Sequence, residues 1–258
     1  MHEEWFQSMA DDEDMPSATE ITPIKSFIDG EISAAEAARR CTCRIAAEPL
    51  PNLEFLWSLC ESMAIELPST QGKIVELLAA IKKIPDPVRN GQPCRINGEK
   101  VFSQLGYFGA GFADGWSGLR DLSRAPDQPL GPEKWARINA FAARLTTRFV
   151  IDWRHRNVET IDDALDKKYL QDARTRDFFL PAAASQIIYG ALPLWNLGND
   201  PGAEPRLSPY RDWVAWRKKL GELADSGDLA EDIKALLRQA VEVMDATAQG
   251  PESSSWLV

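Results

Sequence analysis

Apolar side chains recur at every third or fourth position through most of the chain, and this spacing constrains the fold more than any other feature. It places the apolar residues on one face of an α-helix, whereas a half-buried strand would alternate apolar and polar residues. The clearest case begins after Gly131-Pro132 and predicts one long helix whose apolar stripe crosses the core. The stripe consists of Trp135, Ile138, Phe141, Leu145, Phe149 and Trp153.

The same periodicity elsewhere predicts an all-α protein, an irregular multi-helix bundle of about eight to ten helices. Ser33 and Glu36 form a capping box, which predicts that a helix starts there and continues to residue 48. The strongest β signal is Asn97-Gly98, because both residues adopt positive φ easily and therefore favour a tight turn. We expect at most one small β-hairpin, near residues 94–102.

The domain organisation follows from where apolar surface is available. Residues 1–21 are predicted to be a disordered acidic arm, because the run from Asp11 to Asp14 offers too little apolar surface to offset chain entropy. Residues 22–248 contain neither a fixed repeat nor a long linker, which predicts a single helical domain. Residues 249–258 are predicted to be a flexible tail.

Charge and hydropathy limit the partners. The formal net charge of -10 argues against nucleic acid, because phosphate binding requires clustered Lys and Arg. The N-terminus carries acids where a signal peptide needs a basic start and an apolar run, which predicts a cytoplasmic protein. No 18 consecutive residues are apolar, so we expect no membrane partner. The oligomeric state is left open.

The glycine-rich stretch GYFGAGFADGWSG at 106–118 invites a nucleotide-binding interpretation, which its context does not support. A dinucleotide loop needs G-x-G-x-x-G between a strand and a helix, whereas the spacing here is Gly109, Gly111, Gly115 in a chain without alternating strands and helices. A kinked helix or a close helix contact fits better. Four cysteines and two histidines also lack a zinc-site pattern, so we expect neither cofactor nor metal.

Asp162-Asp163-Ala164-Leu165-Asp166 resembles the D-D-x-x-D magnesium-diphosphate motif of isoprenoid synthases. Carboxylates four positions apart can share one helix face and suit a hard cation. The alternative is that Thr160 and Asp163 cap a helix whose first turn favours acids. No second metal motif accompanies the first.

The predicted long helix carries four polar residues at successive spacings of four, four and three: Arg144, Arg148, Asp152 and His155. At these spacings they would share one helix face. His155 would carry a proton, Asp152 would orient it, and Arg144 or Arg148 would stabilise developing negative charge. The alternative is a solvated edge of ion pairs.

Several segments together resemble the fungal proteins grouped as domain of unknown function 3632. They are EFLWSLCESMA, WARINAFAARLT, LPAAASQIIYGALPLW, WVAWRKKL and AVEVMDA. The resemblance implies a mostly helical protein and transfers no catalytic residue. It makes the polar positions inside the matching segments, Asn139, Arg144 and Gln186, candidates for a site.

The leading functional hypothesis is an apolar cavity that binds a small hydrophobic molecule, and its enzymatic form is a cofactor-free cyclase, isomerase or lyase of secondary metabolism. The aromatic residues could equally fill a core without a ligand. The rival hypothesis is a helical module that binds another protein, and a third is magnesium-dependent diphosphate chemistry at Asp162, Asp163 and Asp166. The predicted substrate-binding residues are Asn139, Trp135, Trp153, Gln186, Tyr189, Trp195 and Trp213.

Overall fold

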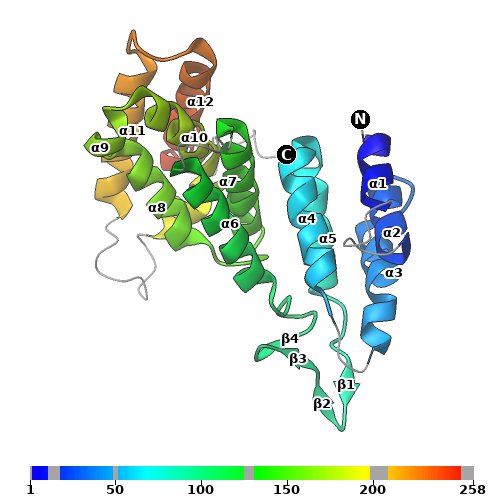
Figure 1. Cartoon of the computed structure of the whole chain (residues 1–258). Helices are drawn as coiled ribbons and strands as arrows, with labels where there is room; N and C mark the ends of the chain where they lie inside the picture. Colours follow the sequence, from blue (N-terminus) through cyan, green and yellow to red (C-terminus); the bar gives the residue numbers. More distant parts are fainter. Residues whose placement is uncertain (1, 11–17, 49–51, 125–130, 198–208, 251–258) are drawn as a thin grey trace. The chain divides into compact units, whose positions relative to one another are not determined.

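The computed structural model describes residues 2–10, 18–48, 52–124, 131–197 and 209–250. Over these ranges the chain forms twelve α-helices, one 3-10 helix and four two-residue strands, so the predicted all-α class is confirmed (Figure 1). Contacts between Cα atoms divide the chain into two compact units, residues 1–118 and 119–258, and each is described by itself. The single helical domain over residues 22–248 stays a prediction.

Unit 1 holds the N-terminal helices and all the strands of the described residues. Its helices α2 and α3 pack against each other, and α3 also packs against α5. The elements are α1 His2–Ala10, α2 Ala18–Ile28, α3 Ala34–Ala47, α4 Glu54–Glu66, η1 Pro68–Thr70, α5 Gln71–Ile81, β1 Val88–Arg89, β2 Gln92–Pro93, β3 Arg95–Ile96, β4 Glu99–Lys100 and the first part of α6 Phe108–Arg124.

The N-terminal residues include a helix that the sequence does not predict. Residues 2–10 form α1, in which Phe6 is buried and Glu3 forms an ion pair with Lys25 of α2 at 2.9 Å. Phe6 supplies an apolar contact in this stretch, and the disordered acidic arm over residues 1–21 stays a prediction. Residues 11–17, where that run lies, are outside the described residues, as are residues 251–258 of the predicted tail.

Two β-hairpins are present instead of one. β3 pairs with β4 around Asn97 and Gly98, whose φ angles of 51° and 87° match the predicted tight turn. β1 pairs with β2 around Asn90 and Gly91 in the same way, with φ angles of 50° and 75°. The second hairpin has the same Asn-Gly signal, but its short strands lack an apolar alternation that would reveal it.

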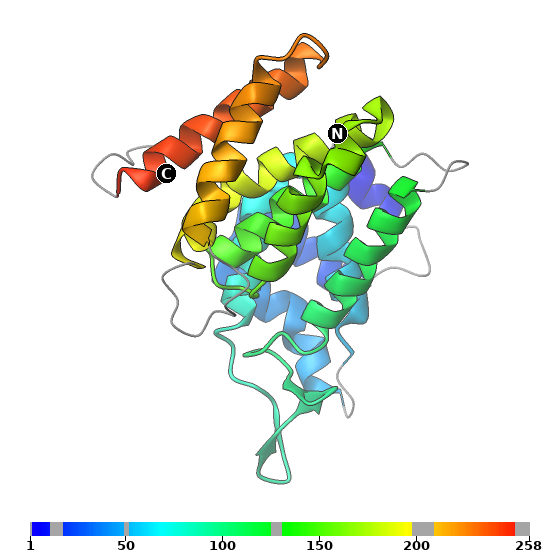
Figure 2. The same cartoon turned by 90° about the vertical axis from the view of Figure 1, so that its left-hand side faces the viewer.

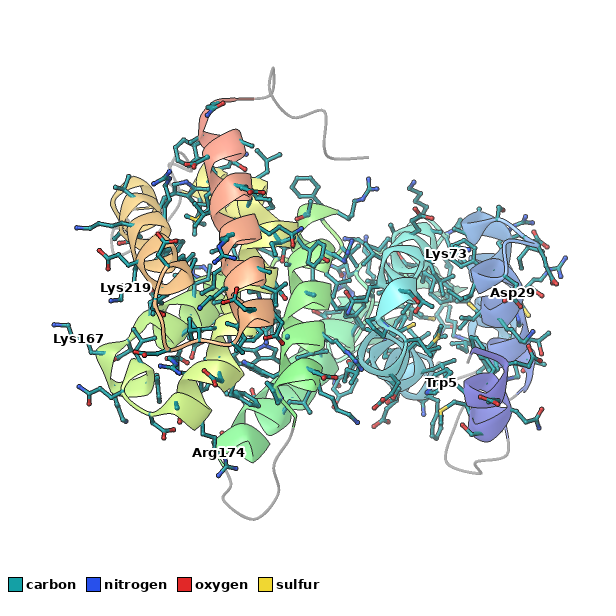
Figure 3. All side chains as sticks on the ribbon, turned by 90° about the horizontal axis from the view of Figure 1, so that it is seen from above. Trp5, Asp29, Lys73, Lys167, Arg174 and Lys219 are labelled. Atoms are coloured by element: carbon teal, nitrogen blue, oxygen red, sulfur yellow. The ribbon has the colours of Figure 1, made fainter. Side chains whose placement is uncertain are left out.

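Unit 2 is built around one long central helix, α10, which packs against α7, α8 and α12. Helices α11 and α12 lie side by side (Figure 2). The labelled side chains of Lys167, Arg174 and Lys219 extend away from its helices (Figure 3). The elements are the end of α6, α7 Pro132–Thr147, α8 Arg154–Leu165, α9 Lys167–Leu170, α10 Ala173–Asn196, α11 Pro209–Ala224 and α12 Glu231–Ala248.

Helix α10 starts earlier and ends later than the sequence indicates. The Asp172 side chain caps its first turn by accepting from the Thr175 N–H at 2.8 Å, and the helix then continues through Pro181 and Gly190. By length and hydropathy α10 could cross a membrane, but 72% of its apolar window is buried inside the protein. We therefore interpret it as a core helix, in which tertiary burial outweighs the hydrogen bond that Pro181 removes.

Candidate functional site

The predicted long helix from residue 135 to residue 153 does not exist, because α7 ends at Thr147. Two hydrogen bonds close the helix end: the Phe149 N–H donates to the Thr146 carbonyl at 3.1 Å, and the Val150 N–H donates to the Leu145 carbonyl at 2.9 Å. This is a Schellman motif, and it needs a left-handed residue at the position of Phe149, whose φ is 55°. The Phe149 side chain is 83% exposed and does not belong to the core stripe.

The break separates the four predicted catalytic residues. Arg144 is on α7, Arg148 is its C-cap, Asp152 lies in the connection, and His155 is on α8, so they do not share one helix face. No hydrogen bond joins Asp152 to His155 in the described residues, and the orienting role of Asp152 stays a prediction. The Asp152 carboxylate accepts from Arg154 Nε at 2.9 Å and Nη2 at 2.8 Å, and these bonds lower the pKa of Asp152.

His155 itself is exposed, and no hydrogen bond joins it to another residue in the part of the chain that the structure describes. A proton carrier needs a pocket that holds the reacting group within hydrogen-bond reach. The pocket that lies in unit 1, described below, does not include His155. Its catalytic role stays a prediction.

Arg144 and Tyr189, both predicted site residues, do meet. The Arg144 guanidinium lies over the Tyr189 ring at 3.8 Å from the ring centre, and the Thr147 hydroxyl donates to the Tyr189 carbonyl at 2.7 Å. Leu192 follows Tyr189 by three positions on α10 and is therefore on the same side of the helix. Tyr189 is 37% and Leu192 51% exposed.

These contacts join the C-terminal end of α7 to α10 at the surface of unit 2. We call the surface formed by these residues the Phe149 face. Its members are Arg144, Arg148, Phe149, Tyr189 and Leu192.

Asn139 and Gln186 also meet, but inside unit 2. Both are fully buried, and Gln186 Nε2 donates to Asn139 Oδ1 at 2.8 Å. The Thr160 hydroxyl lies 3.1 Å from the same oxygen, and Asn139 Nδ2 donates to the Trp135 carbonyl at 2.8 Å. This polar cluster links α7, α8 and α10, so its clearest role is to fix the relative register of three core helices.

The predicted substrate-binding tryptophans pack against other aromatic rings. Trp135 lies 6.0 Å from Phe178 and 6.2 Å from Phe179, measured between ring centres, and Trp195 lies 5.3 Å from Trp213. Trp153 is buried as well. These separations are typical of direct aromatic contacts. Trp213 is buried, as Trp135 and Trp153 are, whereas Trp195 is half-buried, and the substrate-binding role of these residues stays a prediction.

The three carboxylates of the acidic motif each bind a different partner. Asp162 Oδ1 accepts from Trp216 Nε1 at 2.9 Å, Asp163 forms an ion pair with Arg120, and Asp166 accepts from the Lys168 N–H at 2.8 Å. They lie at the end of α8 and not in a first turn, so Thr160 does not cap a helix. Within the described ranges no group of three acids, histidines or cysteines is placed to hold a metal ion.

The glycine-rich stretch contributes to unit 1 as a turn followed by a helix. α6 begins at Phe108 and includes Gly109, Gly111 and Gly115, and the residues before it form turns instead of a strand. A Cβ placed on Gly115 would lie 3.0 Å from Oε2 of Glu61 on α4. Gly115 thus lies close to a side chain of α4, whereas Cβ atoms on Gly109 and Gly118 would meet open space.

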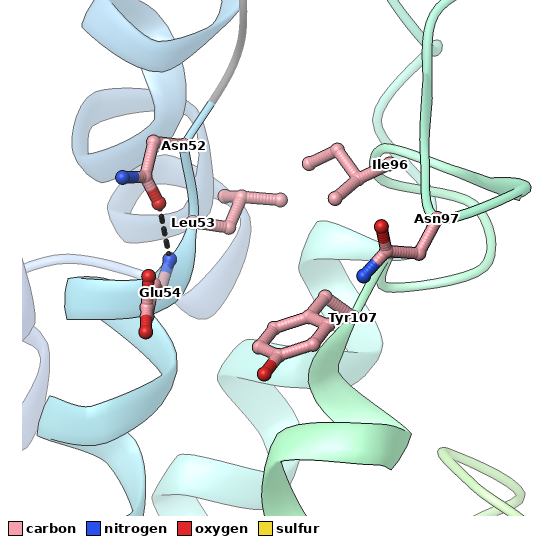
Figure 4. A pocket seen from close by; sticks show the side chains of 7 residues that line it. Asn52, Leu53, Glu54, Ile96, Asn97 and Tyr107 are labelled. Carbon is pink, nitrogen blue, oxygen red and sulfur yellow. Dashed lines mark hydrogen bonds between the residues drawn. The ribbon is translucent and has the colours of Figure 1, made fainter.

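A small pocket lies beside that turn in unit 1. Its volume is about 250 Å³, and it opens between the start of α4, the β3–β4 hairpin and the turn before α6 (Figure 4). None of the predicted site residues lines it. The lining residues are Asn52, Leu53, Glu54, Ile96, Asn97, Gly106 and Tyr107.

The fold and these contacts define a class: a two-unit helical protein with an exposed aromatic and arginine face on unit 2. The family model described as protein of unknown function, DUF3632, matches residues 57–249, and the chain therefore belongs to this family. The predicted resemblance is confirmed, while the fungal origin stays a prediction. No curated protein and no solved structure matches the chain.

Proposed function

We propose that this protein is a helical interaction module that binds a partner protein through the Phe149 face. The observation that carries the proposal is the conformation of Phe149 together with its exposure. A left-handed backbone costs a residue with a Cβ about 1–2 kcal/mol, which is why glycine usually occupies this position of a Schellman motif. An 83% exposed side chain gains little from burial to offset that cost.

The neighbouring arginines indicate the chemistry of the partner. No carboxylate of the described residues lies within ion-pair distance of Arg144 or Arg148, whereas Arg120, Arg154 and Arg217 each have one. Two arginines beside exposed aromatic and aliphatic side chains complement a segment that carries an apolar anchor next to Asp or Glu. The ring of Tyr189 already holds the Arg144 guanidinium in place, which reduces the entropy lost on binding.

The small-molecule hypothesis has less support from these contacts. A cofactor-free cyclase, isomerase or lyase would need an apolar cavity beside its acid and base. In the described parts of unit 2, the predicted lining tryptophans contact other rings and the predicted base is exposed. Diphosphate chemistry is likewise not supported, because its three carboxylates do not converge.

A displayed peptide library tests the proposal. Random peptides are selected on the wild-type protein, with counter-selection on Phe149→Gly. We expect enriched peptides that place an aromatic or large aliphatic residue next to Asp or Glu. Purified peptides should bind at least tenfold more weakly to Phe149→Gly and to Arg148→Glu. They should bind normally to Val214→Ala, which alters an exposed apolar residue outside the Phe149 face.

Misfolding cannot imitate this result, because glycine suits the left-handed position. The free energy of unfolding of Phe149→Gly should therefore be about 1 kcal/mol higher than that of the wild type, although this variant binds the peptides more weakly. Peptides that bind Phe149→Gly as tightly as the wild type would contradict the proposal. A library that yields no peptide selective for the wild type would contradict it too.

A further inference from the structure

The pocket of unit 1 is separate from the Phe149 face and carries its own chemistry. Leu53 and Ile96 point toward one another across its upper part, while the side chains of Glu54, Asn97 and Tyr107 surround the lower part (Figure 4). One side is thus apolar and the other polar. A volume of about 250 Å³ is below the usual range for a drug-sized ligand, so the occupant is a molecule of few atoms.

The turn that carries Tyr107 is held in a costly conformation. Leu105 and Tyr107 have φ angles of 51° and 68°, a region that residues with a Cβ rarely adopt. Such backbone conformations persist only where surrounding contacts impose them, and they concentrate at functional sites. The cost falls on the segment that forms one wall of the pocket.

Hydrogen bonds from other elements fix this turn. Trp57 Nε1 donates to the Gly106 carbonyl at 3.0 Å, and the Tyr107 N–H donates to Glu99 Oε2 at 2.9 Å. The Gly106 N–H donates to the Lys100 carbonyl at 3.1 Å. Gly106 also leaves little room for a side chain, because a Cβ would lie 3.3 Å from both Ile96 Cβ and the Lys100 carbonyl oxygen. The Tyr107 ring is therefore preorganised at the pocket.

The charge at the pocket selects the sign of the ligand. Glu54 is exposed, and no described residue forms an ion pair or a hydrogen bond with its carboxylate. Glu54 lies in the first turn of α4, where its carboxylate supplies the negative charge that a helix N-terminus attracts. The Glu54 N–H donates to Asn52 Oδ1 at 2.9 Å. An anion would meet the negative charge of Glu54 at this end of the helix, whereas a cation would gain that carboxylate as a partner.

We propose that this pocket binds a small alkylammonium compound. Its ammonium group lies between the Glu54 carboxylate and the face of the Tyr107 ring, which both attract cations. The carboxamide oxygen of Asn97 offers a further acceptor, and the alkyl chain runs along Leu53 and Ile96. No step of chemistry is involved, and the site does not depend on the Phe149 face.

Amide NMR with n-butylamine as the probe tests this site. The titration should give saturable shifts of the Tyr107 amide and of the Asn97 side-chain amide. n-Butanol and sodium butyrate at the same concentration and ionic strength should shift these signals less, because they lack the positive charge. Equal shifts with all three compounds would overturn the proposal.

Two variants locate the interaction. Glu54→Gln keeps the shape of the side chain and should weaken n-butylamine binding about threefold, as expected for an exposed ion pair. Tyr107→Asn removes the ring but tolerates a positive φ, and it should weaken binding by a similar factor. Glu76→Gln, which alters another exposed glutamate of unit 1, should bind as the wild type does. Unchanged affinity in both pocket variants would refute the assignment.

Discussion

Glu61 offers a sharp test of the packing in unit 1. Its carboxylate lies against the glycine face of α6, where a Cβ on Gly115 would be 3.0 Å from Glu61 Oε2. No ion pair or hydrogen bond from the residues that the structure describes compensates this charge. Burial therefore raises the pKa of Glu61 from 4.5 to about 7.

The sign of the effect follows from proton linkage. Because the folded state holds this proton more tightly than the unfolded state, the ionised carboxylate destabilises the fold as the pH rises from about 4.5 to about 7. One pKa unit corresponds to about 1.4 kcal/mol, so the rise of about 2.5 amounts to roughly 3 kcal/mol. Partial solvent contact reduces this value, which makes it an upper bound.

Glu61→Gln should remove this penalty, since glutamine has nearly the same shape and no charge. We expect the variant to have a higher free energy of unfolding than the wild type. This increase should be larger at pH 8 than at pH 4.5, by up to about 3 kcal/mol. Urea unfolding at the two pH values measures the difference. A ¹³C NMR titration of the Glu61 carboxyl gives its pKa directly.

Glu76→Gln provides the matched control, because Glu76 is exposed on the neighbouring helix. Its effect on the free energy of unfolding should be the same at both pH values. If Glu61→Gln also gave a pH-independent difference, or if the Glu61 carboxyl titrated near 4.5, the reasoning from burial would be refuted.

Four further substitutions test unit 2. Gly190→Ala should destabilise unit 2 by about 1–3 kcal/mol in thermal unfolding, because the new Cβ would lie 3.2 Å from Ala143 Cβ. Gly221→Ala has open space around the new Cβ, so it should instead stabilise α11 by about 0.5–1 kcal/mol. Arg120→Met should cost about 1–3 kcal/mol in urea unfolding, because it removes the ion pair of the partly buried Asp163 and leaves Glu159 only its ion pair with Arg156. Burial raises the pKa of Asp162, so the ionised carboxylate destabilises the fold. Asp162→Asn should therefore raise the free energy of unfolding more at pH 7 than at pH 3, and an equal change at the two pH values would contradict this.

Local signals in the sequence predicted the elements that depend only on local chemistry. The Ser33 hydroxyl accepts from the Glu36 N–H at 3.2 Å, and α3 begins directly after it. Asn97-Gly98 forms the predicted turn, and Pro209 begins α11. In each case a cap, a turn or a first-turn proline acts within a few residues, so no distant contact is needed to define it.

The end of α7 shows why other boundaries could not be predicted. The apolar spacing continues from Leu145 to Phe149 and Trp153 as if the helix did, and the sequence has no glycine where the chain turns. The structure nevertheless places Phe149 in the left-handed region, a choice that local preference opposes. The long reach of α10 through Pro181 is the converse case, in which burial extends a helix that local preference would stop.

The candidate site could be predicted even less, because chemical function depends on which groups lack a partner. Residue type alone singles out His155, Asp152 and the acidic motif. In the structure, however, the Asp152 carboxylate accepts from Arg154 and the Asp162 carboxylate accepts from Trp216, so both already have partners within the fold. Spacing predicted Arg148 as a site residue, placed Phe149 in the core stripe and did not single out Glu54. The exposure of Phe149 and the unpaired carboxylate of Glu54 in the described residues result from contacts that other residues of the fold make, and they become visible only when those contacts are known.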